Sequence, residues 1–179
     1  MSSTLNLNSA NEIIRIRTAL HGGRVGAPQL TQDGEREGAA LNRAGVVLLT
    51  SSLQVFVEDV FLAASAKAFG EFKDNTVKSK YEKTYSRWGN PSAENIISLF
   101  RRLAINDVFD GLSWGGQSSD RLKNNLNYLN WIRNGIAHGG EIRIRGEVYN
   151  LTTSKLSRFV RVSTTFGQRF EGHVLGKFN

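Results

Sequence analysis

The feature that most constrains the fold of this chain is a long helical pattern between residues 36 and 69. A large apolar residue recurs every seven positions along it, and a second series offset by three residues falls on the same face. We therefore predict one long helix over 36–69 with that face buried. The two series are Leu41, Leu48, Val55, Leu62 and Phe69, and Ala44, Ser51, Glu58 and Ser65.

Shorter helical patterns lie on both sides of this segment. Ser9 or Asn11 is expected to cap the first of them. Asn90 followed by Pro91 predicts a further helix start, with Asn90 as N-cap and proline at the first helical position. Residues 22–34 are rich in glycine and predict a loop. The predicted helices cover about 11–20, 36–69, 73–88, 91–103, 120–138 and 152–174.

These elements predict an all-α helical bundle, with a short β-hairpin or extended segment near 141–149 where polar and apolar residues alternate. A chain of 179 residues fits a single domain over 1–179. We divide it into an N-terminal helix and loop (1–35), a core (36–145) and a C-terminal helix (146–179). The longest uncharged apolar stretch, 44–57, is shorter than the roughly 18 to 20 residues of a membrane span, so we expect no membrane association and a cytoplasmic location.

The positive charge is concentrated in the last third of the chain. Residues 1–120 hold 13 basic and 13 acidic residues, whereas residues 121–179 hold 10 and 3, so the whole net charge of +7 lies there. Such an excess favours a polyanionic partner such as RNA, although a solubilising surface has the same composition. The candidate RNA-binding residues are Arg143, Arg145, Arg158 and Arg161. Tyr81, Tyr85 and Trp88 either stack bases beside neighbouring lysines or, as is more usual for such a stripe, belong to the core.

Most enzyme signatures are absent from the sequence. There is no cysteine, no phosphate-binding P-loop, no GxSxG elbow and no HExxH metal motif. The three histidines, His21, His138 and His173, are too far apart for a ligand spacing, so we expect neither a metal site nor a cofactor.

One polar cluster remains to be explained, at the end of the helix predicted over 120–138. Asn130, Asn134 and His138 stand four residues apart and form a polar stripe, while Arg133 lies about 140° from His138 around the helix. Two such helices meeting at a two-fold axis would combine two guanidinium and two imidazole groups, which suits phosphate chemistry. The alternative is a histidine that caps the helix end beside a surface arginine.

The run NWIRNGIAHG, with Arg133, Asn134 and His138, resembles the Arg-Asn-x-x-x-His motif of HEPN domains. The upstream segments LLTSSLQVFVEDVF and FRRLAINDVFD resemble the RiboL-PSP group of that family over about residues 37–145. The resemblance implies a HEPN-like antiparallel helical bundle. It assigns no counterpart to the loop 22–34 or to the chain beyond residue 149.

The resemblance also implies an activity, since many HEPN domains are metal-independent ribonucleases of toxin–antitoxin and antiviral systems. RNA would be cleaved by attack of its 2′-hydroxyl, leaving a 2′,3′-cyclic phosphate. His138 would move the proton, Arg133 would stabilise the phosphorane, and Asn134 would orient either the histidine or a phosphate oxygen. The implied partners are RNA, a second copy of the chain with the active site at the interface, and an antitoxin or other defence protein. The alternatives are a non-catalytic HEPN-like module that binds RNA or protein, and a helical interaction subunit.

Glu58 is a further candidate for the catalytic site, because a carboxylate on an apolar helix face must find a partner. The functional interpretation is that it pairs with Arg133 or His138. The alternatives are an ion pair with another basic residue, or simple exposure to solvent.

Overall fold

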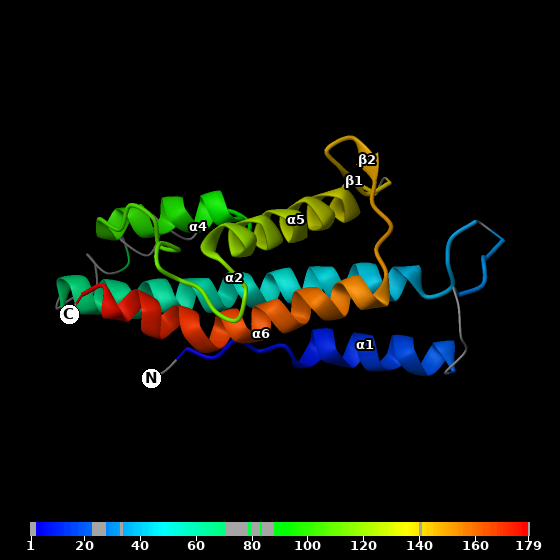
Figure 1. Cartoon of the computed structure of the whole chain (residues 1–179), viewed down its shortest axis with the longest axis horizontal. Coiled ribbons are helices and arrows are strands. Elements are labelled where there is room, and N and C mark those ends of the chain that lie inside the picture. Colours follow the sequence, from blue (N-terminus) through cyan, green and yellow to red (C-terminus); the bar gives the residue numbers. More distant parts are fainter. Residues whose placement is uncertain are drawn as a thin grey trace.

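The computed structural model describes residues 3–22, 28–32, 34–70, 79, 83, 88–139 and 141–178. The described part is mostly helical, with one two-stranded antiparallel hairpin, and this confirms the predicted all-α fold with a short hairpin (Figure 1). The elements are α1 (Asn8–His21), α2 (Ala39–Phe69), α4 (Ala93–Phe100), a 3-10 turn η1 (Arg101–Leu103), α5 (Ser119–Ala137), β1 (Arg143–Ile144), β2 (Glu147–Val148) and α6 (Thr153–Gly176).

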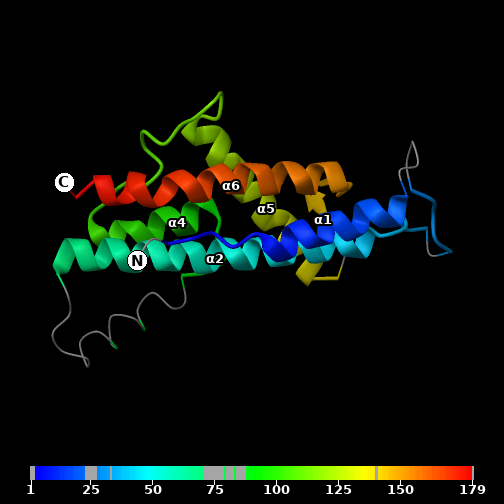
Figure 2. The ribbon, with the colours of Figure 1, turned by 90° about the horizontal axis from the view of Figure 1, so that it is seen from below.

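The bundle is built around α2, whose 31 residues extend over about 46 Å at 1.5 Å per residue. Helix α6 runs beside most of α2, α1 lies along its N-terminal half, α5 also packs on it, and α4 covers its C-terminal half (Figures 1 and 2). Side chains of α6 and α1 come close to α2 at Gly45. A Cβ atom at this position would lie 2.5 Å from Cδ2 of Leu156 on α6 and 3.2 Å from Cγ2 of Ile13 on α1. The missing side chain therefore allows the three helices to meet there.

The predicted buried face of α2 is wrong. Val55 and Phe69 are each 57% exposed, and Leu48 and Leu62 are also open to solvent, whereas the fully buried residues include Leu49, Leu53, Phe56, Val57, Val60 and Phe61. The helix is apolar on most of its circumference, so the seven-residue series marks one of several apolar faces. Contacts with the other helices, which the sequence of α2 does not record, decide which of these faces is covered.

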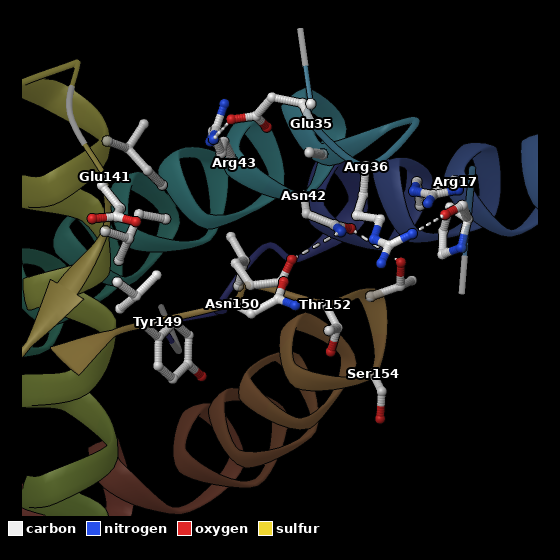
Figure 3. A pocket seen from close by; sticks show the side chains of 18 of the residues that line it. Arg17, Glu35, Arg36, Asn42, Arg43, Glu141, Tyr149, Asn150, Thr152 and Ser154 are labelled. Atoms are coloured by element: carbon white, nitrogen blue, oxygen red, sulfur yellow. Dashed lines mark hydrogen bonds and ion pairs between the residues drawn. The ribbon is translucent and has the colours of Figure 1, made fainter. Parts of the chain in front are cut away.

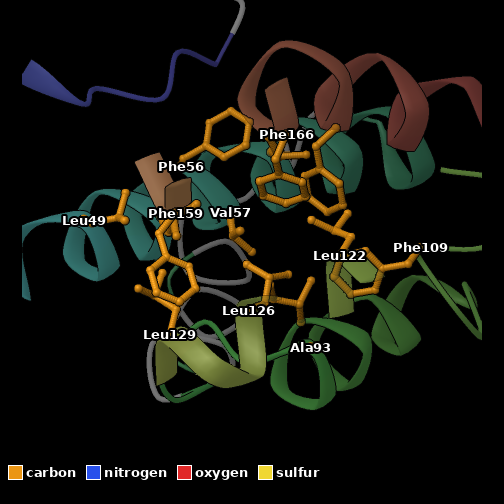
Figure 4. Close-up of a cluster of buried hydrophobic side chains, with 14 of the residues drawn as sticks. Leu49, Phe56, Val57, Ala93, Phe109, Leu122, Leu126, Leu129, Phe159 and Phe166 are labelled. Carbon is orange, nitrogen blue, oxygen red and sulfur yellow. The ribbon is translucent and has the colours of Figure 1, made fainter. Parts of the chain in front are cut away.

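Aromatic rings fill the centre of the bundle. Phe166 and Phe170 of α6 lie with ring centroids 4.5 Å apart, and Phe56 of α2 meets Phe166 edge to face at 5.9 Å (Figure 4). Phe109 approaches both α6 rings from the loop before α5. The apolar residues predicted for α6 are all buried, as expected: Leu156, Phe159, Val160, Phe166, Phe170 and Val174.

Two predicted helix starts are wrong. The N-cap of α1 is Leu7, without a side-chain cap, and neither Ser9 nor Asn11 occupies that position. The N-cap of α4 is Ser92, whose hydroxyl accepts a hydrogen bond from the Asn95 amide, so the helix begins two residues later than Asn90 and Pro91 predict. Serine and asparagine are almost equally favourable as N-caps. Because Ser92 is the N-cap, the side chain of Asn90 is available for another contact.

Other predicted boundaries are confirmed to within a few residues. Helix α5 is capped by Ser118, and α6 by Thr152, whose hydroxyl accepts from the Lys155 amide. The predicted helix over 73–88 lies almost entirely outside the described residues, as do Tyr81 and Tyr85. Trp88, the last residue of that stripe, is buried, in agreement with the core interpretation.

In the described ranges one helix, α2, is long and apolar enough to cross a membrane by length and composition alone. In the structure it is the helix on which the rest of the bundle packs, with twelve buried residues. Its buried apolar residues are accounted for by this central position, whereas others, among them Val55 and Phe69, are exposed.

Candidate active site

The end of α5 carries the motif residues and is fixed by the hairpin that follows it. The helix ends at Ala137, His138 is the C-cap, and Gly139 turns the chain with a φ of 67°. The chain then folds back over the helix, so that a Cβ atom at Gly135 would lie 3.4 Å from the Cα atom of Ile142. The hairpin therefore lies against the last turns of α5 (Figure 1).

Asn134 connects the parts of the motif. Its side-chain Oδ1 accepts a hydrogen bond from Nη1 of Arg133 at 3.2 Å, and its main-chain carbonyl accepts one from the amide of His138 at 3.1 Å. The same Oδ1 accepts a third bond, from Nδ2 of Asn90 at 3.1 Å. The side chain of Asn134 thus holds the guanidinium of Arg133, a contact that the sequence did not predict, and no hydrogen bond from this side chain to His138 is found in the described structure.

Asn90 is a site residue that the sequence assigned to a helix cap. It lies in the segment before α4, where its carbonyl accepts a hydrogen bond from Nδ2 of Asn95 at 2.8 Å. Gly89 allows this contact, because its φ is 101° and a Cβ atom there would lie 2.8 Å from the same Nδ2. A chain of three asparagines, Asn95, Asn90 and Asn134, therefore links the start of α4 to the end of α5.

The side chain of His138 is exposed, and within the described residues it makes no hydrogen bond. No hydrogen bond joins it to Arg133, which is half-buried and bonded to Asn134. This separation agrees with the angle of about 140° between the two positions on one helix. The imidazole does not cap the helix, since only its backbone amide bonds to the preceding turn.

The remaining member of the predicted polar stripe, Asn130, is half-buried on α5. Its Oδ1 is buried without a hydrogen-bond partner. The side of the helix that carries His138 is open: Trp131 is 39% exposed and lies seven residues before His138, within about 20° of it around the helix. Tyr128 holds the Trp131 ring edge to face, with centroids 5.4 Å apart.

The expected pairing of Glu58 with Arg133 or His138 is wrong. Its Oε1 accepts a hydrogen bond from the indole Nε1 of Trp88 at 2.8 Å and a longer one from Nε2 of Gln54 at 3.4 Å. The carboxylate is half-buried, and no ion pair to it is found in the part of the chain that the structure describes. The carboxylate of Glu58 is thus satisfied by a neutral donor, the indole of a residue thirty positions away, and not by a basic side chain. Helical periodicity does not reveal such a contact.

The four predicted RNA-binding arginines are all exposed, on two neighbouring elements. In the hairpin, Arg143 donates to Glu141 at 2.6 Å and to the Gly146 carbonyl at 2.9 Å, so its charge already has a partner. Arg145 lies at the hairpin turn with a φ of 54°. Arg158 and Arg161 stand one turn apart on α6. Burial raises the pKa of Tyr149, and Arg158 opposes that rise, so this arginine lies near the end of the hairpin.

No group of three or more histidine, cysteine, aspartate or glutamate side chains placed to hold a metal ion is found among the described residues. A partly buried charge pair, Lys123 with Asp107 at 2.8 Å, lies at the other end of α5. Burial raises the pKa of Asp107, but the hydrogen bonds from Lys123 and the Phe109 amide outweigh it and lower the pKa. This pair stabilises the start of α5 and is separate from the motif.

Comparison with known proteins gives one match. The sequence profile of the RiboL-PSP-HEPN family matches residues 9–175, from the first turn of α1 to the last turn of α6. The match is wider than the resemblance over 37–145, and it includes both the loop 22–34 and the C-terminal helix. No curated protein and no solved structure matches the chain.

Proposed function

Since the chain belongs to the RiboL-PSP-HEPN family, we propose that it is a metal-independent endoribonuclease that leaves a 2′,3′-cyclic phosphate. Membership of the family indicates a ribonuclease or RNA-binding function. The observation that carries the finer proposal is the arrangement of Arg133, Asn134 and His138 at the open end of α5, where the side chain of Asn134 holds Arg133 and the imidazole of His138 is exposed.

The chemistry follows from these three side chains. The 2′-oxygen attacks the adjacent phosphorus while the bond to the 5′-oxygen breaks. One imidazole accepts the proton of the 2′-hydroxyl, and another donates a proton to the leaving 5′-oxygen. Arg133 carries planar donors that match the phosphoryl oxygens and stabilises the charge that develops on them. Asn134 positions Arg133 through its Oδ1.

The two proton transfers require a second histidine, and the described residues place no other histidine on α5. We therefore propose a homodimer in which two α5 helices face each other and each contributes His138. The exposed Trp131 supports this arrangement, since it lies on the face of α5 that carries His138 and a large exposed aromatic residue is a frequent anchor of interfaces.

The biological setting is proposed from the family alone. As a toxin or an antiviral-defence effector of a prokaryote, the protein would act on RNA in the cytoplasm, and a partner protein such as an antitoxin would restrain it. Arg158 and Arg161 would hold the phosphates of the substrate.

The deciding experiment is incubation of the purified protein with total RNA in the presence of EDTA, followed by analysis of the ends. We expect cleavage that survives EDTA, with 2′,3′-cyclic phosphate and 5′-hydroxyl ends, and no cleavage by His138→Ala. Cleavage that requires a divalent metal would contradict the mechanism. Binding of RNA without any cleavage would support the non-catalytic RNA-binding module instead.

A further inference from the structure

A large open groove lies beside the motif, between the helix that begins the chain and the hairpin. Its volume is about 1100 Å³, and it is bounded by α1, the start of α2, the end of the hairpin and the start of α6 (Figure 3). Ile136 and Gly139, which lie on either side of His138 in the sequence, both line the groove. The groove therefore adjoins the end of α5. None of the predicted site residues lines it.

Arg17 is the most unusual residue in the groove. It is 4% exposed, it makes no ion pair in the described part of the chain, and its Nε is buried without a hydrogen-bond partner. Its side chain lies directly against Gly38, where a Cβ atom would be 2.5 Å from Nε. A buried guanidinium without a carboxylate is costly unless an anion satisfies it, so this residue itself points to a ligand.

A second arginine reaches into the same space. Nη1 of Arg36 donates to the carbonyl of Pro28 at 2.9 Å, a neutral acceptor that leaves its charge uncompensated, and Figure 3 shows its guanidinium extending into the groove beside Asn42. Two carboxylates also line the groove, and each has a cation of its own. Glu35 bonds to Arg43 at 2.6 Å and Glu141 bonds to Arg143 at 2.6 Å.

The start of α6 completes the site. Thr152, Thr153 and Ser154 line the groove, so the positive end of a 24-residue helix faces it, together with the first backbone amides. The Thr153 hydroxyl donates to Oδ1 of Asn42, whose Nδ2 donates to the carbonyl of Leu151. These bonds fix the start of α6 relative to α2, and so they fix the relative positions of these two sides of the groove.

We propose that this groove binds a phosphate of the RNA strand, held by Arg17 and Arg36 at the N-terminus of α6. The inference rests on the proposed function for the identity of the ligand. An RNA strand is favoured because the groove is open along its length and adjoins the end of α5, so that a strand with its scissile phosphate at His138 continues into it. Guanidinium groups and a helix N-terminus are the usual donors to phosphate oxygens.

The test uses an RNA methylated at every 2′-oxygen, which cannot be cleaved, so that binding is measured apart from chemistry. Fluorescence anisotropy at one salt concentration gives the Kd of each variant. We expect Arg36→Gln to weaken binding about tenfold, as the loss of a charge-assisted phosphate contact does. Arg121→Gln is the matched control, because Arg121 is also exposed and also donates Nη1 to a carbonyl, that of Gly116 at 2.8 Å.

Equal binding by Arg36→Gln and Arg121→Gln would overturn the proposal. Arg17→Gln should weaken binding further, and circular dichroism shows whether it is folded; if it is not, Arg36→Gln alone carries the test, since Arg36 is exposed. Inorganic phosphate and a mononucleotide serve as competitors. If a competitor displaces the RNA from the wild type but not from Arg36→Gln, the result supports the site. A mononucleotide that binds the groove without displacing the RNA would overturn the assignment to an RNA strand.

The outcome is separable from that of the nuclease proposal. His138→Ala should bind the methylated RNA as the wild type does, because His138 does not line the groove. A wild type that cleaves no RNA, together with weak binding by Arg36→Gln, would refute the nuclease and leave the groove in place. Normal cleavage by the wild type, together with unchanged RNA binding by Arg36→Gln, would support the nuclease and refute the groove as a phosphate site.

Discussion

Asn90 and Asn134 are joined side chain to side chain, Nδ2 to Oδ1 at 3.1 Å, across 44 positions of the sequence. Because Oδ1 of Asn134 also accepts from Arg133, the segment before α4 helps to set the position of the guanidinium. The motif is therefore supported by a contact from outside α5, and this contact can be tested by its effect on stability and on activity.

Replacing Asn134 by alanine should lower the free energy of unfolding by about 1 to 2 kcal/mol, because it leaves partly buried donors on Asn90 and Arg133 without an acceptor. Asn90→Ala should cost about 1 kcal/mol, and in the double variant the two effects should be coupled by roughly 0.5 to 1.5 kcal/mol. Urea unfolding measures all three. Asn124→Ala, an exposed position on α5, is the control, and strictly additive effects would show that the bond contributes nothing.

His138→Ala should reduce cleavage by about 10² to 10⁴-fold if the imidazole transfers a proton. The free energy of unfolding should change by less than about 0.5 kcal/mol, because the side chain is exposed and makes no hydrogen bond in the described structure. Arg133→Ala should lower kcat similarly while most RNA binding remains, since a group that acts on the transition state affects affinity little. Wild-type cleavage by folded His138→Ala would refute the assignment.

Trp131→Glu should separate the dimer, since it places a charge on the exposed face of α5 beside His138. Light scattering should then report a mass near 19.9 kDa, half that of the wild type, and cleavage should be lost with the composite site. Leu20→Glu is the control, because Leu20 on α1 is also an exposed apolar residue, at 50% against 39% for Trp131, and it should leave the mass unchanged. A wild type that is itself monomeric at micromolar concentration would contradict the arrangement.

Reversing the charges of Arg158 and Arg161 should weaken RNA binding and reduce its salt dependence. Each phosphate contact with single-stranded RNA contributes about 0.7 to the slope of log K against log salt, so the double variant should lose about 1.4. Arg143→Glu should have a smaller effect on affinity, because Arg143 is already paired with Glu141. An unchanged slope in the double variant would remove α6 from the RNA-binding surface.

His173 should make stability depend on pH. Its Nε2 donates to the carbonyl of Val108 at 3.0 Å, and burial, followed by the charge of Lys177, holds its pKa below the ordinary histidine value of 6.5. The unfolded chain therefore takes up a proton at a higher pH than the folded chain does. The stability present above pH 6.5 should fall as the pH is lowered toward the folded pKa, and become constant below it.

Urea unfolding between pH 7.5 and 5 measures this effect. His173→Gln should remove it, and Lys177→Met should diminish it by relieving one cause of the lowered pKa. A His173→Gln protein with the pH dependence of the wild type would show that another group is responsible.

The sequence predicted best those features that depend on neighbours along the chain. The motif was placed correctly at the end of a helix, because Gly139 and the apolar series from Leu122 define that helix locally. The buried face of α6 was also predicted, since its apolar residues fall on one side only. Such features need no knowledge of the partner surface.

What the sequence could not reveal depends on partners distant in the chain. The apolar residues of α2 surround the helix, so the covered face was misassigned, with Val55 exposed and Phe56 buried. Glu58 meets Trp88 thirty residues away, and Asn90 leaves the capping position for Asn134. The groove around Arg17 gave no signal, because an arginine on an amphipathic helix is normally exposed.

Gly45 determines what kinds of sequence change this bundle tolerates. In most helices glycine is a weak point, and alanine in its place adds up to about 1 kcal/mol of stability. Here the added methyl group would meet side-chain atoms of Leu156 on α6 and Ile13 on α1, and these side chains would have to shift. Those two helices carry Thr153 and Arg17, on opposite walls of the groove. The bundle thus keeps a locally unfavourable residue at the point where side chains of α1 and α6 meet α2, the three helices that also border the groove proposed to bind a phosphate.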